Sequence, residues 1–282
     1  MPRIITCAIM ILYSLQMHAQ ELFVSTEPAS NMATGSLGLR MNTKFFKMKN
    51  DGQYAYRLDP EVMVGASKRL MLHLNVYGSN MYQSNFRVEG ASVYGKYRFY
   101  SSDDVHSHFR IAGFSKISMI NNPPVLQKDM HYYYSDEIDI DGNNSGWLAG
   151  IVATQLSHKL AVSSSVSFVN RLNNINATKD PAQSATAINY SLSGGYLVLP
   201  TVYKDYKQTN LNLYFELLGS SSLDKKAYFI DAAPAIQFIF NSISRLDLSY
   251  RTQIAGNMQR LSERYFLLRF EYNLLNIFVN RK

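Results

Sequence analysis

The sequence predicts an all-β protein, a single antiparallel up-and-down transmembrane β-barrel of about twelve strands. Apolar and polar residues alternate with a period of two along many segments, which indicates strands with two different faces. The connections between these segments alternate between short and long, as in bacterial outer-membrane barrels. Aromatic residues make up 13% of the 282 residues, and the mean hydropathy is -0.16. After residue 20, no run of about 20 apolar residues could form a spanning helix.

The first twenty residues have the features of a secretory signal peptide. A charged start at Arg3 precedes a mostly apolar stretch from Ile4 to Leu15, and Met17-His18-Ala19 places a small residue at the expected cleavage site. We expect residues 1–20 to be removed and residues 21–282 to form the barrel. A retained amphipathic anchor is the alternative. Because the only cysteine, Cys7, lies in this segment, the exported chain would have no thiol for a disulfide, a metal site or nucleophilic catalysis.

Five strands are predicted before the longest connection. Arg69–Tyr77 alternates most clearly, because Leu70, Leu72 and Leu74 oppose polar neighbours such as His73. The other four segments show the same period more weakly: Gly35–Met48, Tyr54–Ala66, Phe86–Tyr100 and His108–Met119.

Seven further strands are predicted after this connection. Small residues blur the two faces of the first, and Pro234 predicts a bulge or bend in the fifth because proline cannot donate a ladder hydrogen bond. In the others, large apolar residues alternate with polar ones. The seven segments are Gly146–Ser157, Leu160–Phe168, Ala185–Leu199, Asn210–Leu217, Lys226–Phe240, Arg245–Ile254 and Phe266–Leu274.

The connections support this strand count independently. With the chain starting in the periplasm, the tight turns fall on the inner side: 67–68, 101–107, 158–159, 200–209 and 241–244. Residues 49–53 and the two long connections, 120–145 and 170–184, then lie on the outer side. An even number of strands also returns the chain to the periplasm, as bacterial single-chain barrels require.

The residue types favour a membrane barrel over a secreted sandwich or jelly roll, which is the alternative. The polar faces carry Ser, Asn, Tyr and single charges, where a water-facing sheet would carry many Lys and Glu residues. Aromatic side chains lie toward strand ends, as in the girdles of membrane barrels. These girdle candidates are Tyr54, Tyr56, Tyr97, Phe99, Phe238, Phe240, Phe266 and Phe278. The predicted location is therefore the outer membrane, in contact with its lipid and reached through the barrel-assembly machinery.

Four segments resemble an uncharacterised family of outer-membrane barrels from Bacteroidota-type bacteria. They are Glu21–Met32, Tyr196–Pro200, Tyr203–Tyr214 and Ala233–Ser242. More remotely, the length and strand rhythm are similar to those of barrels grouped with phenol-degradation transporters. The resemblance implies an outer-membrane location and a barrel fold, and it implies no catalytic motif or substrate.

The sequence predicts no enzyme, no cofactor and no metal site. An outer-membrane phospholipase or lipid A deacylase needs a His and a Ser two residues apart on a strand. His106-Ser107-His108 does not match that pattern, and His73 is followed two residues later by Asn75. The acid-rich run from Asp136 to Asn144 is similar to a calcium loop but lacks its closing Glu. We interpret it as a solvated loop that neutralises a basic mouth.

The inward faces predict a basic lumen, because cations outnumber acids on them. Such a lumen lowers the barrier for anions. We therefore expect passive passage of small solutes, including anions, through a narrow channel. A lumen filled by cross-bracing ion pairs is the open alternative, and it would leave a non-conducting barrel with a surface-loop binding or assembly role. The net charge of +7 is spread singly, so nucleic acid is not an expected partner, and the oligomeric state stays open. The predicted solute-pathway residues are Arg40, Lys96, Arg98, Arg110, Arg245, Arg251 and Arg269.

Overall fold

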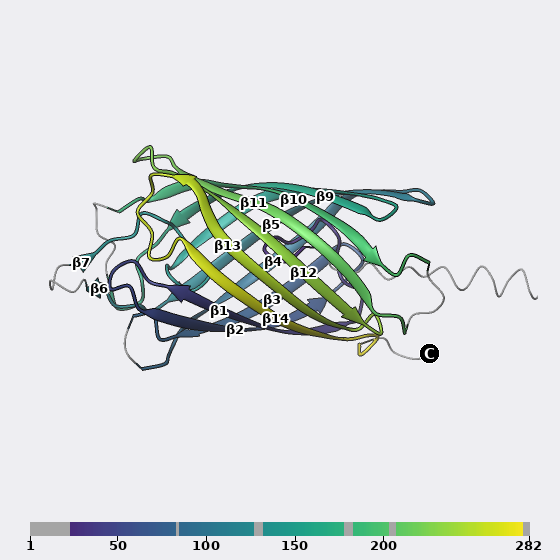
Figure 1. The fold of residues 1–282 in the computed structure, drawn as a ribbon, viewed down its shortest axis with the longest axis horizontal. Helices are drawn as coiled ribbons and strands as arrows, with labels where there is room; N and C mark the ends of the chain where they lie inside the picture. Colours follow the sequence, from purple (N-terminus) through teal and green to yellow (C-terminus); the bar gives the residue numbers. More distant parts are fainter. Residues whose placement is uncertain (1–22, 83–84, 127–131, 178–182, 203–206, 279–282) are drawn as a thin grey trace, which may run out of the picture.

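A computed structural model shows a closed barrel of twelve antiparallel strands, which confirms the predicted fold (Figure 1). It describes residues 23–82, 85–126, 132–177, 183–202 and 207–278. The predicted signal peptide, residues 1–20, lies outside the described residues. No helix within these ranges is long and apolar enough to cross a membrane, a finding that concerns helices alone.

Every predicted strand is present, and most bounds differ from the prediction by one to three residues. The largest extension adds Leu218–Ser222 to β11, and three residues are added to each of β4 (Ser101–Asp103) and β9 (Val169–Arg171), where the hydrophobic alternation ends. The barrel strands are β1 (Leu37–Lys47), β2 (Tyr54–Gly65), β3 (Leu70–Ser79), β4 (Arg87–Asp103), β5 (Ser107–Ile120), β8 (Gly146–Ser157), β9 (Leu160–Arg171), β10 (Thr186–Leu199), β11 (Asn210–Ser222), β12 (Tyr228–Phe240), β13 (Ser244–Gly256) and β14 (Arg264–Leu274).

The ring closes between the first and last strands of the barrel. Leu37 lies opposite Leu274 and Arg40 opposite Glu271 in the β1–β14 ladder, and Figure 1 shows the dark β1 beside the yellow β14. Two short strands, β6 (Val125–Leu126) and β7 (Tyr132–Tyr133), form a separate sheet within the β5–β8 connection. The antiparallel order puts both long connections at one end, the long-loop end, and most of the tight turns at the other, the short-turn end.

The outer surface of the barrel is apolar. On β3, Leu72 and Leu74 are 41% and 52% exposed, whereas their neighbours His73 and Asn75 are buried in the lumen. The other strands expose large aliphatic and aromatic side chains in the same way. A face of this kind suits contact with lipid.

The irregularity expected at Pro234 lies three residues before it. The β12–β13 register shifts between Ile230 and Asp231, while Pro234 keeps its place opposite Phe215 on β11. In the β12–β13 ladder, Ala232 pairs with Thr252 and the next paired residue of β12 is Ala235, opposite Ser249. Proline without an N–H is thus accommodated where one ladder is interrupted.

A charge on the lipid-facing surface should destabilise the barrel. We expect Leu74→Arg to lower the free energy of unfolding by about 2–4 kcal/mol, the cost of a cation near the bilayer midplane. Urea titration of the protein folded into lipid vesicles measures this difference. Val105→Arg is the control, because Val105 lies 76% exposed in the β4–β5 turn. Equal stability of the two variants would contradict a membrane-embedded outer face.

Candidate functional site

The segment before the first strand lies inside the lumen. Phe23, Val24 and Ala29 are almost completely buried, although they precede β1. We call residues 23–34 the N-terminal strap. The strap has no period-two alternation, and Pro28 removes one backbone donor, so the sequence did not mark it as a structural element.

One lumen carboxylate holds the tip of the strap. Glu216 on β11 is fully buried, and its Oε1 accepts hydrogen bonds from the backbone N–H groups of Val24 at 3.0 Å and Ser25 at 2.6 Å. Its Oε2 accepts from the hydroxyls of Thr26 at 2.7 Å and Ser193 at 3.1 Å. Hydrogen bonds to a charged acceptor are the stronger kind. Glu216 therefore fixes the strap across the middle of the barrel.

Further polar contacts fix the middle of the strap to other strands. Lys96 on β4 donates to the Pro28 carbonyl at 2.7 Å, and Thr154 on β8 accepts from the Ala29 N–H at 2.9 Å. Arg40 on β1 pairs with Glu27 at 2.7 Å. Burial alone would raise the pKa of Glu27, but Arg40 and Lys96 hold it well below its usual range. Glu27 is therefore charged at neutral pH and the pair is an ion pair.

Apolar contacts complete the docking of the strap. The Phe23 ring packs edge-on against Tyr214 of β11, with centroids 5.4 Å apart. Tyr214 lies over Gly195 on β10, where a Cβ atom would come within 2.2 Å of the ring. Met32 packs against Met63 and Met71 nearer the short-turn end. Strap and wall thus fill this part of the lumen.

The later part of the β5–β8 connection, residues 136–144, folds into the lumen from the long-loop end. Ile138 and Ile140 are buried and pack against Val169 and Ala187 of the wall. Asp141 forms an ion pair with Lys116 of β5. Burial raises the pKa of Asp141, but the charges of Lys116 and Lys44, together with hydrogen bonds to this carboxylate, hold the pKa below its usual range. The acidic loop therefore neutralises basic residues, as expected, but it does so inside the barrel.

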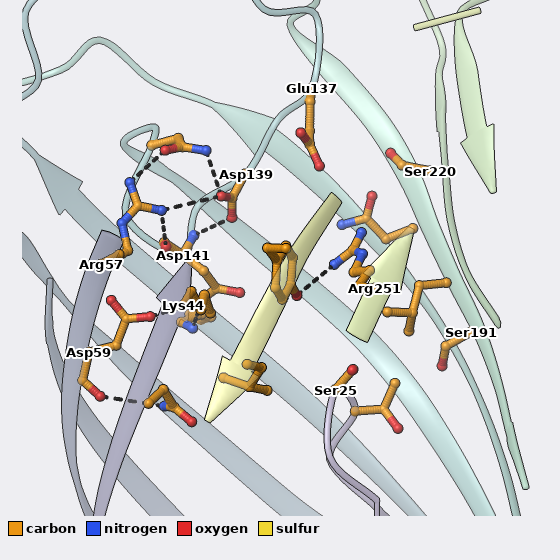
Figure 2. A pocket seen from close by; sticks show the side chains of 18 of the residues that line it. Ser25, Lys44, Arg57, Asp59, Glu137, Asp139, Asp141, Ser191, Ser220 and Arg251 are labelled. Atoms are coloured by element: carbon orange, nitrogen blue, oxygen red, sulfur yellow. Dashed lines mark hydrogen bonds and ion pairs between the residues drawn. The ribbon is translucent and has the colours of Figure 1, made fainter. Parts of the chain in front are cut away.

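A chamber of about 370 Å³ remains between the strap and this loop. Its two sides differ in chemistry. In Figure 2, Lys44, Arg57 and Asp59 lie on one side, and Ser191 and Ser220 lie on the other. One side of the lumen thus concentrates charged groups, and the other carries small hydroxyl groups beside Arg251.

The structure separates the seven predicted pathway residues into four groups. Arg40, Arg251 and Arg269 line the chamber. Lys96 and Arg110 contact the strap, because Arg110 donates to the Ser30 hydroxyl at 2.9 Å. Arg245 is buried in the β13 wall. Arg98 lies at the rim, bonded to the Lys68 carbonyl at 2.7 Å, beside a register shift that ends the regular alternation of β4. Their role in solute passage stays a prediction.

The lumen cations are paired with carboxylates. Arg40 contacts Glu27, Glu61 and Glu271 at 2.7, 3.1 and 2.8 Å. Further pairs join strands around the ring or the loops to the wall, among them Lys44–Asp59, Arg57–Glu89, Arg245–Glu271, Arg251–Asp231, Arg260–Asp231 and Arg269–Asp247. The excess of positive charge read from the sequence is therefore largely compensated in space.

The described residues contain no group of three or more His, Cys, Asp or Glu side chains that could hold a metal ion. His73 is bound through Nδ1 to Glu61 at 2.5 Å, and His106 stacks on His158 at the short-turn end. The absence of enzymatic activity stays a prediction.

No protein-family model matches the sequence, and no curated protein matches it. Among solved structures, the fold is similar to an outer membrane channel from Pseudomonas putida F1. The TM-score is 0.57 at 13% identity, over 89% of this chain and 100% of the channel. The KdgM porin matches with a TM-score of 0.45 at 9% identity, over 83% of this chain and 98% of the porin. At this identity the likeness to the Pseudomonas channel shows a shared barrel fold. Membership of the Bacteroidota-type family stays a prediction.

Proposed function

We propose that this protein is an outer-membrane channel for the passive passage of small solutes, and that the structure represents its closed state. The observation that carries the proposal is the N-terminal strap, which contacts β1, β4, β5, β8, β10 and β11 from inside the lumen. A segment joined to the wall mainly by hydrogen bonds and ion pairs can leave without breaking the barrel ladder. Displacement of the strap would connect the chamber with the short-turn end, which the proposed orientation places in the periplasm.

The pairing of the lumen cations with carboxylates affects which solute charge the channel would favour. A basic lumen attracts anions only where its charge is uncompensated. Since acids flank the arginines and lysines of the wall, the arrangement favours small polar solutes without a strong preference for anions.

Loss of the Glu216 charge tests the gating role of the strap. We expect Glu216→Gln to raise the ratio of open to closed channel about ten- to a hundredfold in planar bilayers. The reason is that hydrogen bonds to a charged group contribute about 1.5–3 kcal/mol. Asp247→Asn is the matched control, since Asp247 is equally buried and its ion pairs run to Arg245 and Arg269. An equal change in the open-to-closed ratio of both variants would show that the strap does not gate the channel.

The same recordings test the alternative function. A non-conducting barrel with a surface-binding role predicts no conductance from the full chain or from any variant. Folding of the protein is verified by a difference in gel mobility between unboiled and boiled samples. The absence of conductance from folded protein in every recording would overturn the proposed channel function.

A further inference from the structure

Several buried polar atoms of the chamber have no protein partner within the described part of the chain. On the charged side they are Asp59 Oδ1, His73 Nε2 and Asn75 Oδ1. These residues are 1%, 4% and 6% exposed. Buried polar groups are normally hydrogen-bonded, and an exception calls for an explanation such as a ligand or water. The three atoms belong to neighbouring strands, β2 and β3.

Two further atoms of this kind lie elsewhere around the chamber. Ser220 on β11 is 4% exposed, and its Oγ has no hydrogen-bond partner among the described residues; the same holds for Ser25 Oγ on the strap. In the ring of twelve strands, β11 lies directly opposite β3. Figure 2 shows Ser220 and Asp59 on opposite sides of the chamber with Ser25 on the strap side. A molecule in the chamber would therefore meet unpaired groups from several directions.

The free atoms on the charged side are mainly acceptors. His73 Nδ1 is hydrogen-bonded to the Glu61 carboxylate at 2.5 Å, and the tautomer with its proton on Nδ1 presents Nε2 as an acceptor. Asp59 Oδ1 and Asn75 Oδ1 are acceptors as well. Serine hydroxyls both donate and accept. The complementary ligand must carry several donors, and hydroxyl groups supply donors and acceptors together.

The charges around the chamber exclude a strongly charged ligand. Seven Arg or Lys side chains and six carboxylates line it. A cation approaching Asp59 would meet Lys44, which pairs with that carboxylate at 2.9 Å. An anion would meet the free acceptor atoms. A neutral ligand encounters neither repulsion nor the loss of an existing ion pair.

Aromatic rings add a flat apolar surface beside the acceptors. Tyr94 on β4 lies 4.8 Å from the His73 ring and 6.1 Å from the Phe114 ring, measured between centroids. Both aromatic residues line the chamber. Small-molecule sites typically combine such surfaces with a few convergent polar groups in about 300–1,000 Å³. The chamber volume of about 370 Å³ is at the small end of that range.

We propose that the chamber is a binding site for an uncharged polyhydroxylated solute of monosaccharide size. The inference deepens the proposed channel function by naming the solute class, and it rests on that function only for the step of passage. Hydroxyl groups would pair with Asp59, His73 and Asn75, while the ring face would lie against Tyr94 and Phe114. Ser220 would contact the opposite edge.

Equilibrium binding to the folded, detergent-solubilised full chain tests the site without requiring conduction. Calorimetric titrations at about pH 8 use glucose, glucuronate and N-trimethylated glucosamine as neutral, anionic and cationic probes of similar size. We expect glucose to bind about tenfold or more tightly than either charged probe, since one unmatched buried charge or hydrogen bond costs about 1.4 kcal/mol or more. Equal binding of all three, tighter binding of a charged probe, or no binding of glucose would overturn the proposal.

Variants locate the binding to the chamber. Asn75→Leu and Ser220→Ala, from opposite sides, should each weaken glucose binding about tenfold. Ser118→Ala is the matched control, because Ser118 Oγ is also buried without a partner in the described residues but does not line the chamber. Boiling-dependent gel mobility verifies folding of each variant. An unchanged affinity in both chamber variants would place the binding elsewhere and reject the site.

The two proposals fail in different measurements. Glucose binding by a protein that never conducts would reject the channel and keep the site. Conductance from a protein that binds no glucose would reject the site and keep the channel.

Discussion

Deletion of residues 23–34 should change the closed lumen into a steadily conducting one. The strap fills the section of the lumen between the chamber and the short-turn end, and its contacts reach six strands. Without it, the described segments that still line the chamber from inside include the β5–β8 connection and the β13–β14 connection, through Asp139 and Arg260. We expect the mean conductance in planar bilayers to rise several-fold over that of the full chain, and flickering closures to disappear.

The deletion leaves the barrel ladder intact, since β1 begins at Leu37. Boiling-dependent mobility should therefore match that of the full chain. A variant in which residues 23–34 are replaced by an equal number of Gly and Ser residues is the control. It keeps the length but loses Phe23, Thr26 and Glu27, and it should conduct like the deletion. Conductance at the level of the full chain in both variants would show that the strap does not close the lumen.

Arg40→Ala should be the most destabilising single substitution in the lumen. The guanidinium contacts three buried or half-buried carboxylates, Glu27, Glu61 and Glu271, and joins the strap to the β1–β2 and β1–β14 ladders. Removing one partner of a buried ion pair leaves uncompensated charge and costs about 3–5 kcal/mol. We expect a loss of that size in urea unfolding from lipid vesicles.

Arg98→Ala is the control for this loss. Arg98 lies at the exposed rim, where substitutions usually change stability by less than about 0.5 kcal/mol. Combining Arg40→Ala with Glu61→Gln should restore part of the lost stability, because the second substitution removes a carboxylate charge that pairs with Arg40. Similar stabilities of the Arg40 and Arg98 variants would contradict a central role for this cluster.

The barrel could be predicted from the sequence because lipid and lumen impose opposite polarities on alternate residues. Leu72 and Leu74 against His73 and Asn75 follow that rule, and the structure places them accordingly. Strand ends were less predictable. The alternation on β11 stops after Leu217 although the ladder continues to Ser222, since glycine and serine are compatible with either face near the ends of a barrel.

The closed lumen could not be predicted, because the lumen and bulk water select similar residues. Ser25, Thr26 and Glu27 suit a solvated linker as well as a segment bound to Glu216 and Arg40. For the same reason the run from Asp136 to Asn144 reads as a solvated loop. Periodicity identified Arg40 as inward-facing, but it contains no information about which charges meet across the barrel.

The attachment of the strap has a kinetic consequence. Gly35, at its end, donates its N–H to the Gly65 carbonyl at 2.8 Å and accepts from the Phe278 N–H at 3.1 Å. A displaced strap thus stays tethered to the barrel near its binding site in the lumen. A short tether gives the strap an effective concentration in the millimolar range at that site. Resealing is then unimolecular, so dwell times should not depend on how many copies of the protein share the membrane.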